Sequence, residues 1–134
     1  MSESFPPQPP APQSPPPAPG GLADNVASAL AYFTIIPAVL FLLIEPYKSR
    51  PLVRFHSFQS IAFVVASFLL HVVVHLTRMM LHWIPLIGLA FMLLDVMVAL
   101  VLFLVWLFVV YKASQGEWYK LPVLGDFAEQ QARA

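Results

Sequence analysis

Residues 55–77 read FHSFQSIAFVVASFLLHVVVHLT, an apolar run that contains no Asp, Glu, Lys or Arg. Two similar runs accompany it: Asn25–Ile44 is also free of these charges, and Ile84–Tyr111 contains only Asp95. Each is about 20 residues or longer, the length that an α-helix needs to cross the hydrocarbon core of a bilayer. Because hydrocarbon offers the backbone no hydrogen-bond partner, such runs persist there as helices. The sequence therefore predicts an all-α integral membrane protein surrounded by the lipid bilayer.

The composition agrees with lipid as the solvent of most of the chain. Mean hydropathy is +0.75 and 10% of the 134 residues are charged, whereas soluble domains contain about 25% charged residues. The formal net charge is zero, so no basic excess indicates nucleic acid as a partner. Cysteine is absent, which excludes disulfides, thiolate metal ligands and cysteine nucleophiles. One membrane domain with two tails accounts for the length of the chain.

We predict a three-helix transmembrane bundle in which the last two helices form a long hairpin. Asp24 or Asn25 can cap the first helix, and Pro37 is expected to kink it near its midpoint. Pro85 can begin a helix but interrupts one that runs through it, so it separates the second and third helices. Dividing the last run into two crossings of about 14 residues would give a fourth span, but such crossings are shorter than the usual ~20 residues. The bundle occupies residues 24–112, with spans at about 25–44, 55–82 and 84–111.

The two tails differ in composition from the bundle. Residues 1–23 contain nine prolines and no Lys or Arg, so they form neither a signal peptide nor a packed core, and we predict a disordered Pro-rich tail. P-x-x-P spacings in this tail can dock into an aromatic groove of a soluble partner, although a plain spacer is favoured. Residues 113–134 are predicted to form an interfacial segment with a short amphipathic helix, and Trp118 and Tyr119 are its anchors in the headgroup layer.

Basic residues indicate how the bundle lies in the membrane. Lys48, Arg50 and Arg54 concentrate in the connection between the first and second predicted helices, and the positive-inside rule places this connection in the cytoplasm. With three spans, the N-terminus then lies outside the cell and the C-terminus in the cytoplasm. We therefore predict a multi-pass protein of the cell membrane in this orientation.

Four ionisable residues follow one stripe of the second predicted helix. His71, His75, Arg78 and His82 are spaced at i, i+4, i+7 and i+11, and Asp95 lies in the next helix. A hairpin centred near residue 83 places His71 and Asp95 twelve residues from its centre on either side, and therefore at equal depth. A carboxylate in hydrocarbon costs about 2.5–3.5 kcal/mol. We therefore expect Asp95 to face inward and to pair with His71.

Three roles are open for this intramembrane polar pair. The leading one is an interhelical clamp, because polar contacts between membrane helices contribute about 0.6 kcal/mol on average and favour one pairing. A proton relay is the second, since a histidine that titrates near neutrality beside an acid can pass a proton. A metal site formed by His71, His75 and Asp95 is the third. No H-E-x-x-H pattern or cysteine accompanies these residues, so we predict neither a metal nor a cofactor.

A second polar cluster lies at the cytoplasmic end of the second predicted helix. It consists of Arg54, His56, Gln59 and Ser60. The last three are spaced at i, i+3 and i+4 and therefore share one face of the helix. Arg54 can extend its guanidinium to lipid phosphates. We expect satisfied contacts with a neighbouring helix or the C-terminal segment here, in preference to a ligand site.

Two stretches resemble a bacterial membrane family: Arg54-Phe-His-Ser-Phe-Gln-Ser and Gly116-Glu-Trp-Tyr-Lys-Leu-Pro-Val-Leu-Gly-Asp-Phe-Ala-Glu. They are similar to the small proteins of unknown function grouped with the Tic20-like family, relatives of a chloroplast inner-envelope protein-import component. The resemblance covers about residues 24–131. It implies a helical membrane protein that takes part in a protein-conducting or assembly complex. The plant relatives are described with more membrane helices than are predicted here.

These observations favour a non-enzymatic membrane protein. We expect it to be a subunit or assembly partner of a membrane complex, with other membrane subunits or further copies of itself as partners. The alternative is a small proton or ion carrier that uses His71 and Asp95. An enzyme would need a nucleophile or an acid–base pair in an accessible cavity, and Asp95 is the only acid within the predicted spans.

Overall fold

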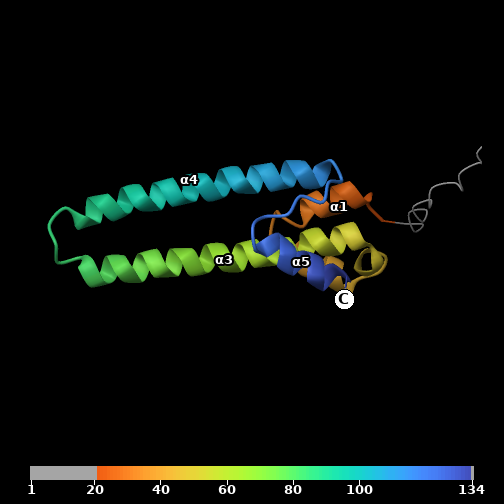
Figure 1. The fold of residues 1–134 in the computed structure, drawn as a ribbon, viewed down its shortest axis with the longest axis horizontal. Coiled ribbons are helices and arrows are strands. Elements are labelled where there is room, and N and C mark those ends of the chain that lie inside the picture. Colours follow the sequence, from red (N-terminus) through yellow and green to blue (C-terminus); the bar gives the residue numbers. More distant parts are fainter. Residues whose placement is uncertain (1–20, 134) are drawn as a thin grey trace, which may run out of the picture.

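The computed structural model describes residues 21–133, and all regular structure in that range is helical (Figure 1). The all-α prediction is therefore confirmed, while residues 1–20 of the predicted Pro-rich tail lie outside the described range. The elements are α1 (Asp24–Leu30), α2 (Ile35–Leu43), the 3-10 turn η1 (Tyr47–Ser49), α3 (Pro51–Leu81), α4 (Ile87–Ser114) and α5 (Leu124–Arg133). Within this range α3 and α4 are the two helices that are long and apolar enough to cross a membrane. Their lengths are roughly 46 and 42 Å.

The first apolar run does not cross the membrane as one helix, so the prediction of three spans is wrong. It forms the two short helices α1 and α2, of 7 and 9 residues, which cover only about 10 and 14 Å. The chain then returns to its starting end, because the N–H of Leu22 before α1 donates a hydrogen bond to the Tyr47 hydroxyl after α2 (2.8 Å). The two short helices therefore form a re-entrant hairpin. The four-span alternative is wrong as well, since α4 is one continuous helix.

The break between α1 and α2 lies at residues 31–34, before the predicted kink at Pro37. Thr34 has extended backbone angles (φ −148°, ψ 170°) and immediately precedes α2. Pro37 therefore falls in the first turn of α2, where its missing N–H removes no intrahelical hydrogen bond. The proline begins a new helix instead of bending a continuous one.

Side chains of the long helices satisfy the backbone that this break exposes. Ser60 Oγ of α3 donates a hydrogen bond to Ala31 O (2.6 Å), and Trp106 Nε1 of α4 donates one to Tyr32 O (2.7 Å). Non-helical backbone is tolerated at membrane depth where protein groups provide such partners. The re-entrant turn is thus held by both α3 and α4.

α1 packs against both the beginning of α3 and the end of α4. Its buried residues are Ala27 and Ser28, and Ala31 follows it in the same environment. Small side chains allow helix backbones to approach closely. The long helices also contribute small buried residues at this end, namely Ser57, Ser60 and Ala113.

The polar residues at the beginning of α1 bind other elements of the chain. Arg50 Nη1 lies 3.0 Å from Asp24 Oδ1, and Asn25 Nδ2 donates a hydrogen bond to Ser114 O at the end of α4 (2.9 Å). The N-cap residue of α1 is Ala23, which makes no side-chain cap hydrogen bond. The predicted capping by Asp24 or Asn25 is therefore wrong, because tertiary partners take both side chains.

α5 packs against α3 and provides the predicted short C-terminal helix. A buried cluster joins the two helices through Phe55, Ala128 and Ala132. Gly125 lies so close to the preceding segment that a Cβ atom there would be 2.6 Å from Lys120 Cα. Lys120 also pairs with Glu129, and the hydrogen bond from its ammonium lowers the pKa of that carboxyl. Close packing and charge pairing together fix the position of α5.

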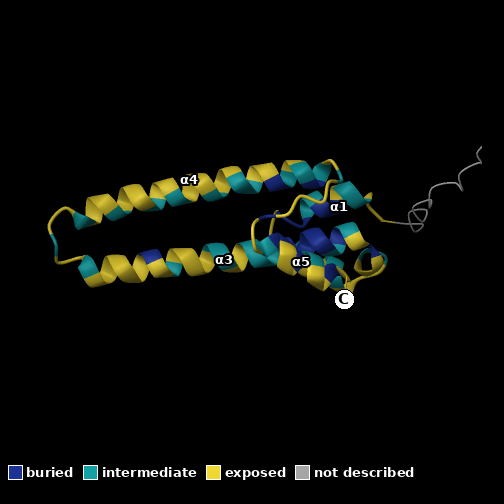
Figure 2. Cartoon of the chain, in the orientation of Figure 1, coloured by how far each residue is buried: buried dark blue, intermediate teal, exposed yellow. Residues whose placement is uncertain are grey.

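Burial divides the α3–α4 hairpin into two regions (Figure 2). We call the region that holds α1, α2 and α5 the packed end, because most buried residues lie there. The remaining parts of the long helices, residues 61–81 and 87–108, are mostly exposed, and we call them the arms. At the tip that joins the arms, Trp83 and Leu86 are 73% and 81% exposed. The chain thus buries one end of its hairpin and leaves the other available to its surroundings.

Replacing Gly125 with alanine is expected to displace α5 from α3, because the new Cβ meets the Lys120 backbone. Amide hydrogen exchange of residues 124–133 in the detergent-solubilised protein should become roughly tenfold faster or more. Gly88→Ala in α4 is the matched control, since nothing lies within 4 Å of a Cβ there. Unchanged exchange of α5 in both variants would contradict the close approach at Gly125.

Candidate functional site

Several buried polar side chains meet at the packed end. Tyr32 comes from the re-entrant turn, and His56, Gln59 and Ser60 come from the first turns of α3. His56 and Gln59 are 1% and 0% exposed. The segment after α4, residues 117–121, provides backbone partners for both. Sequence reasoning placed the three α3 residues on one face but did not identify Tyr32, whose apolar neighbours concealed it.

Gln59 joins three parts of the chain. Its Nε2 donates hydrogen bonds to Tyr32 Oη (2.9 Å) and Tyr119 O (3.1 Å), and its Oε1 accepts one from the Leu121 N–H (3.2 Å). Both amide hydrogens are therefore used, together with one acceptor position of the side-chain carbonyl. Gln59 connects the re-entrant turn to the segment that leads to α5.

Both ring nitrogens of His56 have partners within the chain. Nε2 lies 2.8 Å from Glu117 O, and a carbonyl oxygen only accepts, so Nε2 carries a hydrogen. Nδ1 lies 3.0 Å from Tyr32 Oη, which also accepts a hydrogen bond from Gln59. The imidazole of His56 is therefore held by the re-entrant turn on one side and by the segment after α4 on the other.

Arg54 is the fourth residue of the predicted cytoplasmic-end cluster, and it binds backbone carbonyls. Its guanidinium donates hydrogen bonds to Ala132 O (3.3 Å) and Gln131 O (3.1 Å) in the last turn of α5, and to Lys48 O (3.1 Å). Carbonyl groups at a helix C-terminus lack intrahelical partners and attract cations. Arg54 therefore binds the C-terminal helix α5, whereas the sequence also allowed contact with lipid phosphates.

The predicted interfacial anchors lie beside this network. Trp118 packs against Phe55 with 4.9 Å between ring centroids, and Tyr119 packs against Phe108 with 4.8 Å. Both anchors remain partly exposed. Their position in the headgroup layer stays a prediction.

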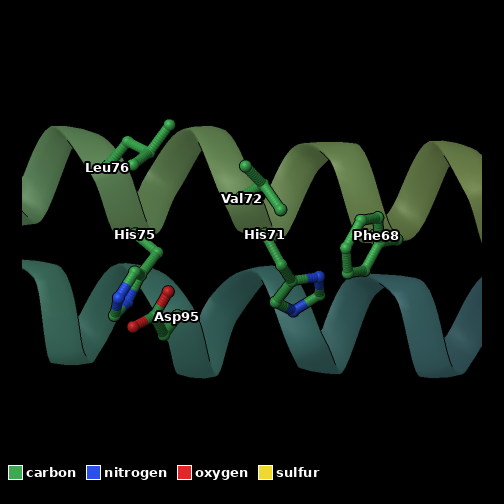
Figure 3. A pocket seen from close by; sticks show the side chains of 6 residues that line it. All are labelled: Phe68, His71, Val72, His75, Leu76 and Asp95. Carbon is green, nitrogen blue, oxygen red and sulfur yellow. The ribbon is translucent and has the colours of Figure 1, made fainter.

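The predicted intramembrane polar residues line two neighbouring hollows along the arms. The first has a volume of about 370 Å³, and Figure 3 shows His71 and His75 pointing from α3 towards α4, with Asp95 beside His75. The second has a volume of about 440 Å³ and shares His75 with the first. We call this side of the hairpin the cleft face. Its ionisable residues are His71, His75, Arg78, His82 and Asp95.

Asp95 forms its ion pair with Arg78, and not with His71 as expected. Arg78 Nη1 lies 3.9 Å from Asp95 Oδ2, and the two side chains are 47% and 41% exposed. His71 Nδ1 instead lies 2.7 Å from Ser67 O of its own helix. Helical side chains tilt towards the N-terminus of their helix, so Asp95 tilts towards the tip and His71 tilts away from it. An equal count of residues from the centre of the hairpin therefore does not make these two side chains meet.

The region between the cleft face and the buried network is almost entirely apolar. On α3, Ser67 is the only polar residue between Ser60 and His71. A third hollow of about 210 Å³ is lined in this region by Leu70, Met97, Val98, Val101 and Leu102. Within residues 21–133, no group of three or more His, Cys, Asp or Glu side chains is placed to hold a metal ion.

Sequence comparisons find related membrane proteins. The magnetosome magnetite crystal formation protein family matches residues 23–128. A protein of Archaeoglobus fulgidus described as a UPF0132 membrane protein is 42% identical over 111 residues, which are 82% of this chain and 96% of the relative. A UPF0132 membrane protein of Methanocaldococcus jannaschii is 36% identical over 111 residues, which are 82% of this chain and 89% of the relative. No solved structure matches the chain.

These matches correct the resemblance to the Tic20-like family. The matched region contains the whole Arg54–Ser60 stretch and nearly all of residues 116–129, on which that resemblance rested. Both stretches therefore occur in a different family, and the implied role in protein import has no further support. Because the relatives are described as membrane proteins, the prediction of a membrane protein is confirmed.

Leucine in place of Gln59 should destabilise the packed end, since it leaves Tyr119 O and the Leu121 N–H buried without partners. Each such group costs about 1–3 kcal/mol, so the free energy of unfolding in detergent should fall by about 2–6 kcal/mol. Gln130→Leu, at an exposed position of α5, is the control and should change it by less than about 0.5 kcal/mol. Equal effects of the two substitutions would show that the network does not stabilise the fold.

Proposed function

We propose that this chain, which belongs to the magnetosome magnetite crystal formation protein family, is a non-enzymatic membrane component that assembles with other protein in the bilayer. The observation that carries the proposal is the half-exposed Arg78–Asp95 pair on arms that are mostly apolar. Acyl chains can cover apolar side chains but solvate charged groups poorly. A protein neighbour can cover the apolar side chains and also pair with the charged groups, which favours a role as a subunit of a membrane complex.

The packed end supports a structural role over a catalytic one. The hydrogen-bonding groups of Gln59 and His56 are used inside the chain, and both side chains are fully buried. A catalytic acid, base or nucleophile has to reach a substrate. The network instead joins the re-entrant turn, α3 and the segment before α5 into one unit.

The related proteins are compatible with the same role. The family description refers to crystal formation in magnetosomes, whereas the archaeal relatives are described only as membrane proteins. A membrane-embedded subunit that organises other protein is a role that both descriptions allow. We therefore place the function of this chain in assembly within the membrane.

The packed end is proposed to lie on the cytoplasmic side of the membrane. Leu22, the connection at residues 45–50 and α5 all lie at this end. The positive-inside rule places the end that is rich in Lys and Arg in the cytoplasm and the tip on the other side. This topology replaces the predicted N-terminus outside the cell. The basic residues of the packed end are Lys48, Arg50, Arg54, Lys112, Lys120 and Arg133.

Because the chain contains no cysteine, single-cysteine variants can test this topology in intact cells. Trp83→Cys at the tip should react with a membrane-impermeant thiol reagent added from outside. Leu22→Cys and Gln130→Cys should react only after the membrane is permeabilised, since both lie at the packed end and are exposed. If Leu22→Cys and Gln130→Cys were labelled from opposite sides of the membrane, the topology with two spans would be contradicted.

A small proton or ion carrier is the second candidate, and one observation favours it. His71, His75 and Asp95 line one hollow, which brings titratable groups together. A path across the membrane needs further polar groups, whereas Ser67 is the only polar residue of α3 between Ser60 and His71. We therefore rank assembly above transport. A proton-flux assay in vesicles, with Asp95→Asn as control, distinguishes the two.

A photo-reactive amino acid at Leu76, an exposed residue that lines the first hollow, tests assembly in native membranes. We expect covalent adducts to protein, because protein is proposed to cover the cleft face. Leu104 is the matched control, since it is an exposed α4 residue that lines neither hollow of the cleft face, and it should form mainly lipid adducts. Lipid adducts alone at Leu76 would overturn the proposed function.

A further inference from the structure

We propose that the cleft face is a homodimer interface in which Asp95 of each copy meets Arg78 of the other across a two-fold axis along the membrane normal. The proposal rests on the proposed function and names the partner as a second copy of this chain. It is carried by the geometry of the pair, its surroundings and the distribution of charge on the face.

The ion pair within one chain leaves both charged groups incompletely used. Its single N–O contact is 3.9 Å long, whereas charge-assisted N–H···O bonds are about 2.7–2.9 Å. A guanidinium carries five N–H donors and a carboxylate has two acceptor oxygens. Nearly half of each side chain is exposed. Both groups can therefore take a further partner without giving up the existing contact.

Apolar surface lies on both sides of the pair along the hairpin. Towards the tip, Met79 and Met80 are exposed, and towards the packed end, Val96 and Met97 are exposed. A bilayer that covers this surface also surrounds the charged pair. Because charge facing acyl chains is unfavourable, the pair is the part of the arms that gains most from a protein neighbour.

The charge distribution identifies a second copy as that neighbour. One face carries a cation on α3 and an anion on α4, within 3.9 Å of each other. A two-fold axis makes an interface isologous, so that residue i contacts residue j and j contacts i. Two identical faces can therefore place each Arg78 beside the Asp95 of the other copy without any other protein. The four charges then form one neutral cluster.

The hollows of the cleft face agree with this arrangement. Hollows of about 370 and 440 Å³ lie beside the pair on the surface of the hairpin. Side chains of a second copy would fill these hollows. His75 and His82 line them as well and would supply further hydrogen-bonding groups within the same interface.

Two charge-reversal variants test the proposal when they are mixed. Arg78→Asp and Asp95→Arg each place like charges across the interface, so each alone should self-associate roughly tenfold more weakly than the unmodified chain or worse. In the mixture, the introduced carboxylate faces the introduced guanidinium and the native Asp95 faces the native Arg78. The mixed pair should therefore regain most of the lost association. Chains labelled through Gln130→Cys in phosphatidylethanolamine/phosphatidylglycerol vesicles allow measurement by energy transfer.

Mixing cannot repair the contact within a chain, since each single variant keeps like charges in its own hairpin. Equal weakness of the mixture and the single variants would therefore overturn the proposal, as would a monomeric unmodified chain. The double variant Arg78→Asp/Asp95→Arg restores both kinds of contact and should dimerise, which keeps the test decisive if a single variant fails to fold. Arg133→Asp in α5 is the remote control and should dimerise like the unmodified chain.

The crosslinking experiment at Leu76 separates this proposal from the proposed function. Adducts to other proteins, together with a monomeric unmodified chain in vesicles, would overturn the homodimer and leave the assembly role intact. Lipid adducts alone would overturn both. Adducts between two copies of the chain, together with recovery in the mixture, are the results expected from the interface.

Discussion

The carbonyl groups of the re-entrant turn have to find hydrogen-bond donors inside the protein, because Ala31 and Tyr32 are buried and lie between α1 and α2. Ser60 and Trp106 donate to two of these carbonyls, and the Tyr32 side chain ties the same turn to Gln59 and His56. These donors come from α3 and α4 at one level of the hairpin. The turn therefore forms between these two helices. After it, the chain reverses direction, and α2 returns to the packed end where α1 begins.

Two properties of the protein follow from this constraint. The packed end combines close helix contacts with a polar network that is bonded within the chain. Within residues 21–133, α1 and α2 both stop at the packed end and therefore leave most of the arms uncovered. The fold is thus determined at one end of the hairpin, while the other end presents surface to lipid or to another protein.

Hydropathy alone predicted the helical class, the long hairpin and the turn near Pro85, because these depend on apolar length and a local breaker. It failed for Asn25–Ile44, which has the length of a span but becomes two helices through hydrogen bonds to residues far away in the sequence. A signal was present in Tyr32, Thr34 and Pro37, which lie near the middle of a mostly apolar run. The partners of Arg54 and Asp95 could not be predicted in this way, because they depend on where α5 docks and on how side chains tilt.

Both regions of the chain obey the same rule, that a polar group removed from water needs a partner. At the packed end, Gln59 and His56 meet this rule within the chain, so their contribution is stability. On the arms, Arg78 and Asp95 meet it incompletely, because two helices alone cannot surround them. The cleft face, where these two charges are incompletely paired, is therefore the surface at which a partner would gain most from binding. In a chain with two candidate spans, the incompletely paired charges on the cleft face are the physical basis for the association in the membrane that we propose.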